Sequence, residues 1–387
     1  MTFKKNSMQN IKHNVNRLPF VSIVVPTYNR SYCLGSTLDS ALTQTYQNIE
    51  ILVVDDGSQD DTPDVIRDRY GAEPRVRYFR QPNAGVSAAR NRAMEMAQGD
   101  SIAFLDSDDV WEPWKLSVQL ACLAYCPDVG MVWTDMKAVD SAGAMLSERY
   151  LRRMYSAYRH YPSHSLFTES FPLTEILAAH VLNAEVLDAK NPTNYCDAFP
   201  IAEWQALRFH TGVIFPQMVR SSFVHTSAVL LRREWALQVG AFDTQFHNIG
   251  EDYVFHLRTT KLGKVGYVDV SSIHYRVKAE DQLTQPSNHL GAARNFLIVV
   301  ERELSDPVTR HQLGEALCAE TLAEAYAWIG HELLTKGDTQ SAKRYFQKSL
   351  EFAPGGPEVR RQLLAASLPE GVYSAVRSLY RRVRYGG

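Results

Sequence analysis

The sequence predicts an α/β fold built on a mostly parallel sheet, followed by an all-α region. From about residue 20 to residue 139, short β-branched runs alternate with amphipathic segments, which is the pattern of a parallel sheet covered by helices. Beyond about residue 288, long segments with apolar residues at helical spacing continue, punctuated by glycine and proline. A chain of 387 residues is long enough to hold both parts as separate domains.

The individual elements follow from local signals. Short buried strands are expected to begin at Val21, Ile51, Val76 and Ile102. Residues 31–45 carry an apolar stripe at helical spacing, and Ser31 is expected to cap this helix. A second helix is expected to open at residues 61–64, where Pro63 occupies an early helical position and its missing N–H costs little. Residues 151–220 are rich in aromatic residues and histidine without a clear period, and we interpret them as an insertion.

Composition excludes several classes of protein. A formal net charge of −2 gives no global electrostatic reason to expect a nucleic acid as a partner. The five cysteines are an odd number without disulfide-like spacing, which favours a reducing compartment. Residues 1–18 contain no apolar core of a secretory signal, and no segment approaches the ~20 apolar residues needed to span a bilayer. We therefore expect a cytoplasmic protein that is not embedded in a membrane.

The most informative motif is the run Phe-Leu-Asp-Ser-Asp-Asp at residues 104–109, an apolar strand end that delivers three carboxylates. Asp106 and Asp108 lie on the same side of an extended segment and can reach one hard divalent cation and a ribose together. Mg²⁺ or Mn²⁺ suits such oxygen ligands. An isolated motif of this kind is equally well explained as a solvated acidic turn that caps the next helix, but two companion motifs favour the metal site.

The first companion motif is Asp-Asp-Gly-Ser at residues 55–58, which alone would indicate only a tight turn. At the end of a buried strand, however, paired carboxylates cost desolvation unless something binds them, and a nucleoside offers an imide N–H and ribose hydroxyls. Tyr28 follows the strand that ends at Pro26, and its ring can offer an aromatic surface to the base.

The second companion motif covers residues 83–91. It combines Gly85, which permits close backbone approach, with Arg90 on the following helix, which is expected to face a diphosphate. The structural alternative is a loop and helix cap with a solvated arginine.

As a set, these motifs resemble the family 2 glycosyltransferases of the GT-A fold, in which a strand ending in Pro-Thr-Tyr-Asn-Arg is followed by the three motifs in this order. The resemblance spans about Val21 to Tyr267. It implies that a nucleotide-sugar donor is bound by Pro26, Thr27, Tyr28, Arg30, Asp55, Asp56, Asn83, Gly85, Arg90, Asp106, Ser107 and Lys278. Among these, Pro26, Thr27, Tyr28 and Asp56 are implied to bind the nucleoside. Asp106 is implied to contact the ribose or sugar, and Asp108 to coordinate the metal.

A further resemblance concerns the catalytic base. Gly-Ala-Phe-Asp at residues 240–243 and Glu-Asp at residues 251–252 look like the family's Gly-Gly-Phe-Asp and Glu-Asp segments. A hydroxyl is a poor nucleophile at neutral pH, so a carboxylate must take its proton, and the resemblance implies Asp252 for this role, with Glu251 as the competitor. The alternative is an acidic pair that stabilises a helix N-terminus by ~0.3–1 kcal/mol.

One position departs from the family. Many relatives carry Tyr-Arg-x-His after this helix, with the histidine near the metal, whereas residues 275–278 read Tyr-Arg-Val-Lys. The cationic Lys278 is suited to pair with a leaving diphosphate but is not assigned as a metal ligand. His274 is out of register, so the third protein ligand stays open.

The helical region beyond residue 288 has two features of interest. Residues 326–354 resemble one tetratricopeptide repeat, which cannot bury its own face and is expected to pack on flanking helices. Its two interpretations are a helical appendage that stabilises the catalytic domain, which we prefer, and a docking surface. Residues 372–385 predict a basic amphipathic helix, suited either to an anionic membrane surface or to packing on the domain.

The sequence therefore predicts an N-terminal extension (residues 1–19), a GT-A domain (20–287) with an acceptor-side insertion (151–220), and a helical domain (288–387). The resemblance implies a metal-dependent, inverting transferase that moves one sugar from a nucleotide diphosphate donor, a UDP-sugar, to a hydroxyl acceptor, using Mn²⁺ or Mg²⁺. The expected acceptor is a cell-envelope polysaccharide or lipid-linked glycan, with a protein as the alternative, and the expected location is the cytoplasm, at the inner face of the membrane. The rival interpretations are a scaffold built on a degenerate transferase, a nucleotidyltransferase and a retaining transferase.

Overall fold

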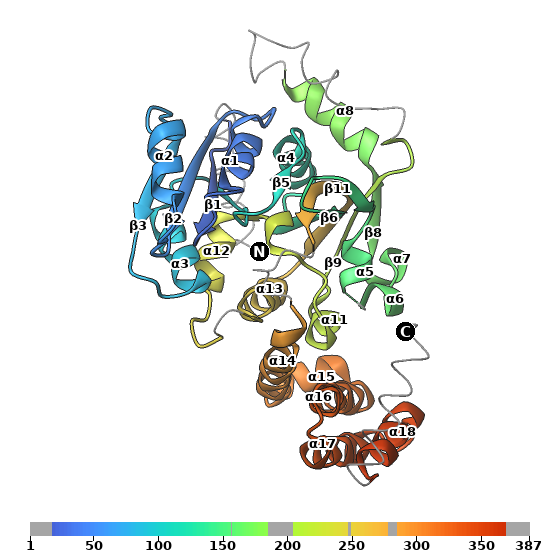
Figure 1. The fold of residues 1–387 in the computed structure, drawn as a ribbon. Coiled ribbons are helices and arrows are strands. Elements are labelled where there is room, and N and C mark those ends of the chain that lie inside the picture. Colours follow the sequence, from blue (N-terminus) through green and yellow to red (C-terminus); the bar gives the residue numbers. More distant parts are fainter. Residues whose placement is uncertain (1–17, 156, 185–203, 247–248, 278–284, 369–387) are drawn as a thin grey trace. The chain divides into compact units, whose positions relative to one another are not determined.

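The computed structural model describes residues 18–155, 157–184, 204–246, 249–277 and 285–368 (Figure 1). The chain divides into two compact units. The first comprises residues up to Ile214, Phe223–Thr244 and Arg258–Lys278, and the second comprises Phe215–Ser222, Gln245–Leu257 and the chain from Ala279 onward. The predicted α/β part and all-α part are both observed.

One mixed sheet forms the centre of the first unit. Its strands, in chain order, are β1 (Val21–Thr27), β2 (Ile49–Asp55), β3 (Val76–Arg80), β4 (Ser101–Phe104), β5 (Val110–Trp111), β6 (Met131–Val139), β7 (Met145–Ser147), β8 (Glu169–Pro172), β9 (Arg208–Gly212), β10 (Leu230–Arg232) and β11 (Val265–Arg276). Within the described residues the main path runs β3-β2-β1-β4-β10-β6-β11-β9-β8, with β5 paired to β11 and β7 to β6. Strands β1 to β4 are parallel to one another, whereas β10 is antiparallel to both of its neighbours.

The helices of the first unit are α1 (Leu34–Leu42), α2 (Thr62–Tyr70), α3 (Val86–Met96), α4 (Lys115–Tyr125), α5 (Leu151–Met154), α6 (Ala157–His160), α7 (Ser163–Leu166), α8 (Leu173–Ala184) and α12 (Arg233–Val239), with the 3₁₀ turn η2 (Thr226–Ala228). Strands β1 and β2 are buried throughout, because α3 packs on both of them and the sheet is covered as an α/β architecture requires. The second predicted helix opens as expected, with Asp61 at the N-cap and proline in its first turn.

The expectation that Ser31 caps the first helix is wrong. Helix α1 begins at Leu34, and its N-cap position is Cys33, whose side chain accepts no capping hydrogen bond. The backbone N–H of Ser31 instead donates to Asp60 Oδ2 at 2.9 Å. The loop after β1 is therefore held by the loop after β2, an interaction between distant segments that local capping signals do not report.

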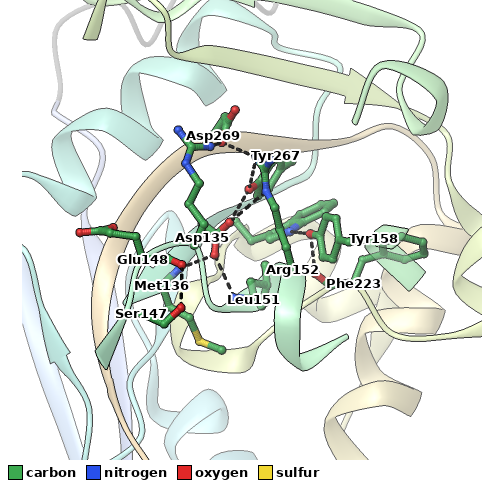
Figure 2. A network of polar contacts seen from close by, with 12 residues as sticks. Asp135, Met136, Ser147, Glu148, Leu151, Arg152, Tyr158, Phe223, Tyr267 and Asp269 are labelled. Atoms are coloured by element: carbon green, nitrogen blue, oxygen red, sulfur yellow. Dashed lines mark hydrogen bonds and ion pairs between the residues drawn. The ribbon is translucent and has the colours of Figure 1, made fainter. Parts of the chain in front are cut away.

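The predicted insertion at residues 151–220 contributes two strands that its irregular pattern did not indicate. Strand β9 pairs antiparallel with β11, and β8 pairs with β9 at the edge of the sheet. Figure 2 shows the buried polar network that joins the start of this segment to the sheet. Asp135 of β6 accepts hydrogen bonds from Leu151 N at 3.0 Å and from the Tyr267 hydroxyl of β11 at 2.9 Å, and it forms an ion pair with Arg152 at 3.3 Å.

The second unit is helical. Its elements are α11 (Phe215–Arg220), the first part of α13 (Glu251–Lys261), η3 (Pro286–Asn288), α14 (His289–Leu304), α15 (Pro307–Leu313), α16 (Glu315–Lys336), α17 (Thr339–Phe352) and α18 (Pro357–Ala366). Helices α16 and α17 approach closely, because a Cβ on Gly330 would lie 2.6 Å from the Phe346 ring. Gly337 ends α16 at φ 94°, and Asp338 caps α17 by accepting from Ser341 N at 3.0 Å. The resemblance of this pair to a tetratricopeptide repeat stays a prediction, and residues 372–385 lie outside the described residues.

No described helix is both long and apolar enough to cross a membrane.

Candidate functional site

The sequence motifs meet at one edge of the sheet. In the parallel register, Thr27 of β1 lies opposite Asp55 of β2, and Val24 lies opposite Phe104 of β4. The loops that follow these strands therefore leave from the same edge, the carboxyl end at which open α/β sheets bind their ligands. This confirms the expectation that the polar motifs gather there.

Asp55 organises the turn that follows β2. Its buried carboxylate accepts hydrogen bonds from Ser58 N at 2.7 Å and from the Tyr78 hydroxyl at 2.6 Å, and burial together with this bond raises the pKa of Tyr78. Gly57 has φ 85°, so a side chain there would be strained, and its Cβ would lie 3.0 Å from Asn83 N. Both oxygens of Asp55 are thus occupied by groups of the same chain.

Asp56 holds the loop that contains the Asn83 and Gly85 motif. Its Oδ1 accepts from Gln81 Nε2 at 2.7 Å and from Ala84 N at 3.0 Å, and its Oδ2 accepts from Gly85 N at 2.7 Å. Gly85 adopts φ 91° immediately before α3. The second and third motifs are therefore one connected structure.

Four candidate donor-binding residues lie at the end of β1 or just beyond it. Thr27 is 2% exposed, and its hydroxyl oxygen has no hydrogen-bond partner in the described chain, which is unusual for a buried polar atom. Pro26 is buried, whereas Tyr28 is 42% exposed and offers a ring to the outside. Arg30 places its guanidinium 3.9 Å from Asp108 Oδ2.

Arg90 is bonded to the acidic motif. Its Nη2 donates to Asp106 Oδ1 at 2.7 Å, and its guanidinium lies over the Phe242 ring, 5.2 Å from the centroid. Burial raises the pKa of Asp106, but the charges of Arg90 and His225 and the hydrogen bonds of Arg90 and Ser227 outweigh it and hold the pKa below its usual value. Asp106 is therefore an ionised carboxylate at neutral pH.

The loop of residues 106–109 is bonded to α1 and to Cys33 at the N-cap of that helix. The Ser107 carbonyl accepts from Thr37 Oγ1 at 2.9 Å and from Cys33 Sγ at 3.4 Å, and Ser107 itself is buried. The side chain of Asp108 is 20% exposed and that of Asp106 is 26% exposed. Consecutive residues of the motif thus face different surroundings.

Asp109 and His225 lie beside Asp106, and neither was assigned from the sequence. One ligand atom from each of the three side chains lies within 4.8 Å of the others, a grouping that can hold a metal ion. Asp109 is 1% exposed, and among the described residues neither of its carboxylate oxygens has a hydrogen-bond partner. Burial and the charges of Asp108 and Asp106 raise the pKa of Asp109 well above its usual value. No spacing rule pointed to His225, because it is more than a hundred residues away in sequence.

The expected catalytic pair belongs to the second unit. Glu251 and Asp252 begin α13, where Glu251 is buried and Asp252 Oδ1 accepts from Tyr253 N at 2.7 Å. The Tyr253 hydroxyl lies 2.9 Å from the Met218 carbonyl of α11, so the start of α13 is anchored within this unit. Lys278 lies outside the described residues.

Residues 22–174 match the family model described as glycosyl transferase family 2. This part of the chain is similar to family 2 glycosyltransferases. Relatives include the hyaluronan synthase of Pasteurella multocida, 37% identical over 35% of this chain and 14% of that protein. The chondroitin synthase of Escherichia coli is 37% identical over 37% of this chain and 21% of its own length. A putative teichuronic acid biosynthesis glycosyltransferase of Bacillus subtilis, TuaG, is 40% identical over 27% of this chain and 42% of its length. The chain thus matches less than half of each of these relatives.

Solved structures show the fold of a larger part of the chain. The structure of S. aureus TarS residues 1–349 superposes on this chain with a TM-score of 0.53 at 16% identity. The match covers 95% of this chain and 93% of the TarS chain. The same fragment in complex with UDP-GlcNAc has a TM-score of 0.52 and 15% identity, over 93% of this chain and 92% of that chain. The α/β part of the chain therefore has the GT-A fold, as the sequence predicted, with helices following it.

Proposed function

We propose that this chain is a metal-dependent, inverting glycosyltransferase that moves a single sugar from a UDP-sugar to a hydroxyl group of an acceptor. The observation that carries the proposal is the buried acidic group at the strand ends, in which both oxygens of Asp109 lack a hydrogen-bond partner. A buried carboxylate without a partner is costly, and a divalent cation would satisfy it. The uridine nucleotide is supported by the structures of TarS with UDP and with UDP-GlcNAc.

The nucleoside would lie beside Thr27 and Tyr28. The Thr27 hydroxyl is buried and without a partner, so it is available to a ligand, and the exposed ring of Tyr28 offers a stacking surface. Pro26 would contact the nucleoside on the same side. Asp55 and Asp56 would act mainly by holding the turn and the Asn83 to Gly85 loop in place, since their oxygens already accept hydrogen bonds from the chain.

The diphosphate would lie at the acidic motif. The resemblance assigns Asp108 to the metal and Asp106 to the ribose or sugar, and the spacing of the two carboxylates lets both reach one cation. This donor set fits Mn²⁺ or Mg²⁺ because these cations favour carboxylate oxygen. When bound, the cation supplies charge that offsets the negative charge developing on the leaving diphosphate. Arg30, Arg90 and Lys278 would add positive charge, Arg90 through its bond to Asp106.

The acceptor would be activated by a carboxylate. We propose Asp252 as the group that removes the proton of the attacking hydroxyl, with Glu251 as the competing assignment. A single displacement at the anomeric carbon inverts its configuration. The family resemblance supports this assignment, and the location of both residues at the start of one helix is consistent with either choice.

The acceptor class is proposed from the relatives. Hyaluronan synthase, chondroitin synthase and TuaG carry names of polysaccharide synthesis, which favours a cell-envelope polysaccharide or a lipid-linked glycan over a protein. Residues 151–220 would lie on the acceptor side of the catalytic domain (residues 20–287), and the helical domain (288–387) would stabilise it. We place the enzyme in the cytoplasm, with residues 372–385 binding the inner face of the membrane.

The first experiment needs no acceptor. The melting temperature of the full chain is measured with UDP-, dTDP- and GDP-sugars, with and without Mn²⁺, for the wild type and for Asp108→Ala. We expect a rise for the wild type only, with UDP-sugars only, and only with Mn²⁺, because a ligand that binds the native state stabilises it. Absence of any shift in a folded protein would contradict the proposal and favour the scaffold alternative.

A further inference from the structure

We propose that His225 is a protein ligand of the divalent cation and joins two carboxylates, Asp106 and Asp109, in a mixed nitrogen and oxygen site. Asp108, which the family resemblance assigns to the metal, would complete this site from the same loop. This inference rests on the proposed metal dependence. The family resemblance left the third ligand open, because this chain has Lys278 where many relatives have histidine. The assignment comes from the described geometry, in which one ligand atom of each of the three side chains lies within 4.8 Å of the others.

The sheet topology explains why His225 reaches this edge. Strand β10 lies between β4 and β6 and runs antiparallel to β4, with Leu230 opposite Ala103. Residues that precede β10 therefore lie at the edge where β4 ends and the acidic motif begins. A parallel strand in this place would deliver its leading segment to the opposite edge.

The turn that carries His225 is held rigidly against the acidic loop. Ser227 Oγ accepts from Asp106 N at 3.0 Å, which ties the turn directly to the acidic loop. The Ser227 carbonyl accepts from the Trp111 indole N–H at 3.0 Å. The His225 ring also packs edge-on against Tyr275, with centroids 5.0 Å apart. A ligand that must be positioned within a few tenths of an ångström needs support of this kind.

Further support comes from the core beneath this turn. The buried side chain of Gln119 donates to the Ala228 carbonyl at 2.7 Å and accepts from Lys115 Nζ at 2.7 Å. Lys115 lies over the Trp111 ring, 4.0 Å from its centroid, and burial lowers its pKa well below the usual value. The turn that presents His225 is therefore fixed by interactions on the side facing the core.

Asp109 gives independent evidence that a ligand belongs here. Only 1% of Asp109 is exposed, and neither of its carboxylate oxygens has a hydrogen-bond partner in the described chain. Buried side-chain oxygens of native proteins nearly always have one. Asp106 and His225 each place a ligand atom within 4.8 Å of an Asp109 oxygen, so a cation bound by all three would satisfy it.

The ligand types indicate which cation fits. A site of two carboxylates and one imidazole suits Mn²⁺ better than Mg²⁺, because Mg²⁺ strongly prefers oxygen ligands and keeps most of its waters. We therefore expect Mn²⁺ to bind more tightly than Mg²⁺ in the absence of any nucleotide.

The test measures binding of Mn²⁺ alone to the metal-stripped full chain, by titration calorimetry and by pulsed electron paramagnetic resonance. We expect the bound Mn²⁺ of the wild type to show coupling to a ¹⁴N nucleus. His225→Gln should remove this coupling and weaken Mn²⁺ binding by about 10-fold or more. The matched control is His274→Gln, since His274 bonds Glu112 at 2.9 Å and lies outside the group, and it should leave both readouts unchanged.

Asp109→Asn provides a second readout that does not depend on activity. It removes a carboxylate that would bind the cation, so it should abolish the rise in melting temperature that Mn²⁺ causes in the wild type. Bound Mn²⁺ without nitrogen coupling in the wild type, or unchanged Mn²⁺ affinity in a folded His225→Gln, would overturn the inference. If those results came together with metal-dependent turnover, the proposed function would still hold and only the assignment of His225 would be wrong. If Mn²⁺ showed nitrogen coupling but no nucleotide sugar bound, the metal site would hold and the proposed function would be wrong.

Discussion

Asn91 exchanges two hydrogen bonds with the backbone of Phe242, from which it is separated by 151 residues. Its Nδ2 donates to the Phe242 carbonyl at 2.9 Å, and its Oδ1 accepts from Phe242 N at 2.7 Å. The same Phe242 ring packs against Phe104 and lies under Arg90, which bonds Asp106. Asn91, the last residue of the motif at residues 83–91, therefore fixes the Gly-Ala-Phe-Asp segment at residues 240–243 beside the acidic site.

Replacing Asn91 with leucine should destabilise the domain. The change leaves the N–H and the carbonyl of Phe242 without these partners, and each unpaired buried group costs roughly 1–3 kcal/mol. Urea denaturation measures the loss. Glu95→Leu, at an exposed position of the same helix, is the control and should change the free energy of unfolding little. Equal effects of the two variants would show that the bonds to Phe242 are unimportant.

Replacing Thr27 with valine should separate ligand binding from stability. Valine keeps the shape and removes a buried hydroxyl that has no partner, so the melting temperature should stay the same or rise. Affinity for UDP in the presence of Mn²⁺ should fall by about 10-fold, since a net hydrogen bond is worth about 1 kcal/mol or slightly more. Calorimetric titration with UDP checks this, and unchanged affinity would exclude the Thr27 hydroxyl from the nucleoside site.

Asp252→Asn should stop transfer without preventing donor binding. A positioned general base contributes about 10²- to 10⁴-fold to the rate, so turnover should fall within this range while the UDP-sugar affinity remains near that of the wild type. Glu251→Gln is measured beside it. If Glu251→Gln causes the larger loss of turnover and Asp252→Asn retains near-normal rates, the two roles must be exchanged.

The network in Figure 2 predicts a strong effect of Asp135 on the docking of residues 151–212. Asp135→Leu removes one carboxylate partner of Arg152, which keeps Asp269, and leaves Leu151 N and the Tyr267 hydroxyl without their acceptor, so it should cost about 3 kcal/mol. Tyr267→Phe removes only one hydrogen bond to Asp135 and should cost about 1 kcal/mol. Limited proteolysis together with urea denaturation distinguishes them, and similar losses in both variants would argue against the ion pair.

A second ion-pair group predicts how stability depends on pH. A hydrogen bond from His274, opposed by burial and aided by Lys137, lowers the pKa of Glu112 to about 2. Because the folded pKa lies below the ordinary value of 4.5, the contribution to stability is present above pH 4.5 and is lost as the pH falls toward 2. We expect Glu112→Gln to flatten the pH dependence in this window by on the order of 2 kcal/mol. Urea midpoints between pH 5 and pH 3 measure it, and parallel curves for the two proteins would contradict the assignment.

Much of the site could be predicted from local sequence. The strands that end at Thr27, Asp55 and Phe104 are short apolar runs, and each is followed by polar residues that cannot continue a buried strand. Parallel neighbours then bring these ends to one edge, so the sequence order of the motifs was enough to place them together. The two strands of residues 151–220 were missed, because short strands at a sheet edge carry little alternation.

By itself, the sequence determined the fold class, the shared edge of the sheet and the resemblance to family 2 glycosyltransferases, since all three rest on patterns within a few residues of each strand. Only the tertiary structure brought His225 to Asp109, Asn91 to Phe242 and Asp135 to Tyr267. Each of these pairs joins residues more than a hundred positions apart. Their contact depends on which strands lie side by side and in which direction they run, and no local spacing of residue types reports that.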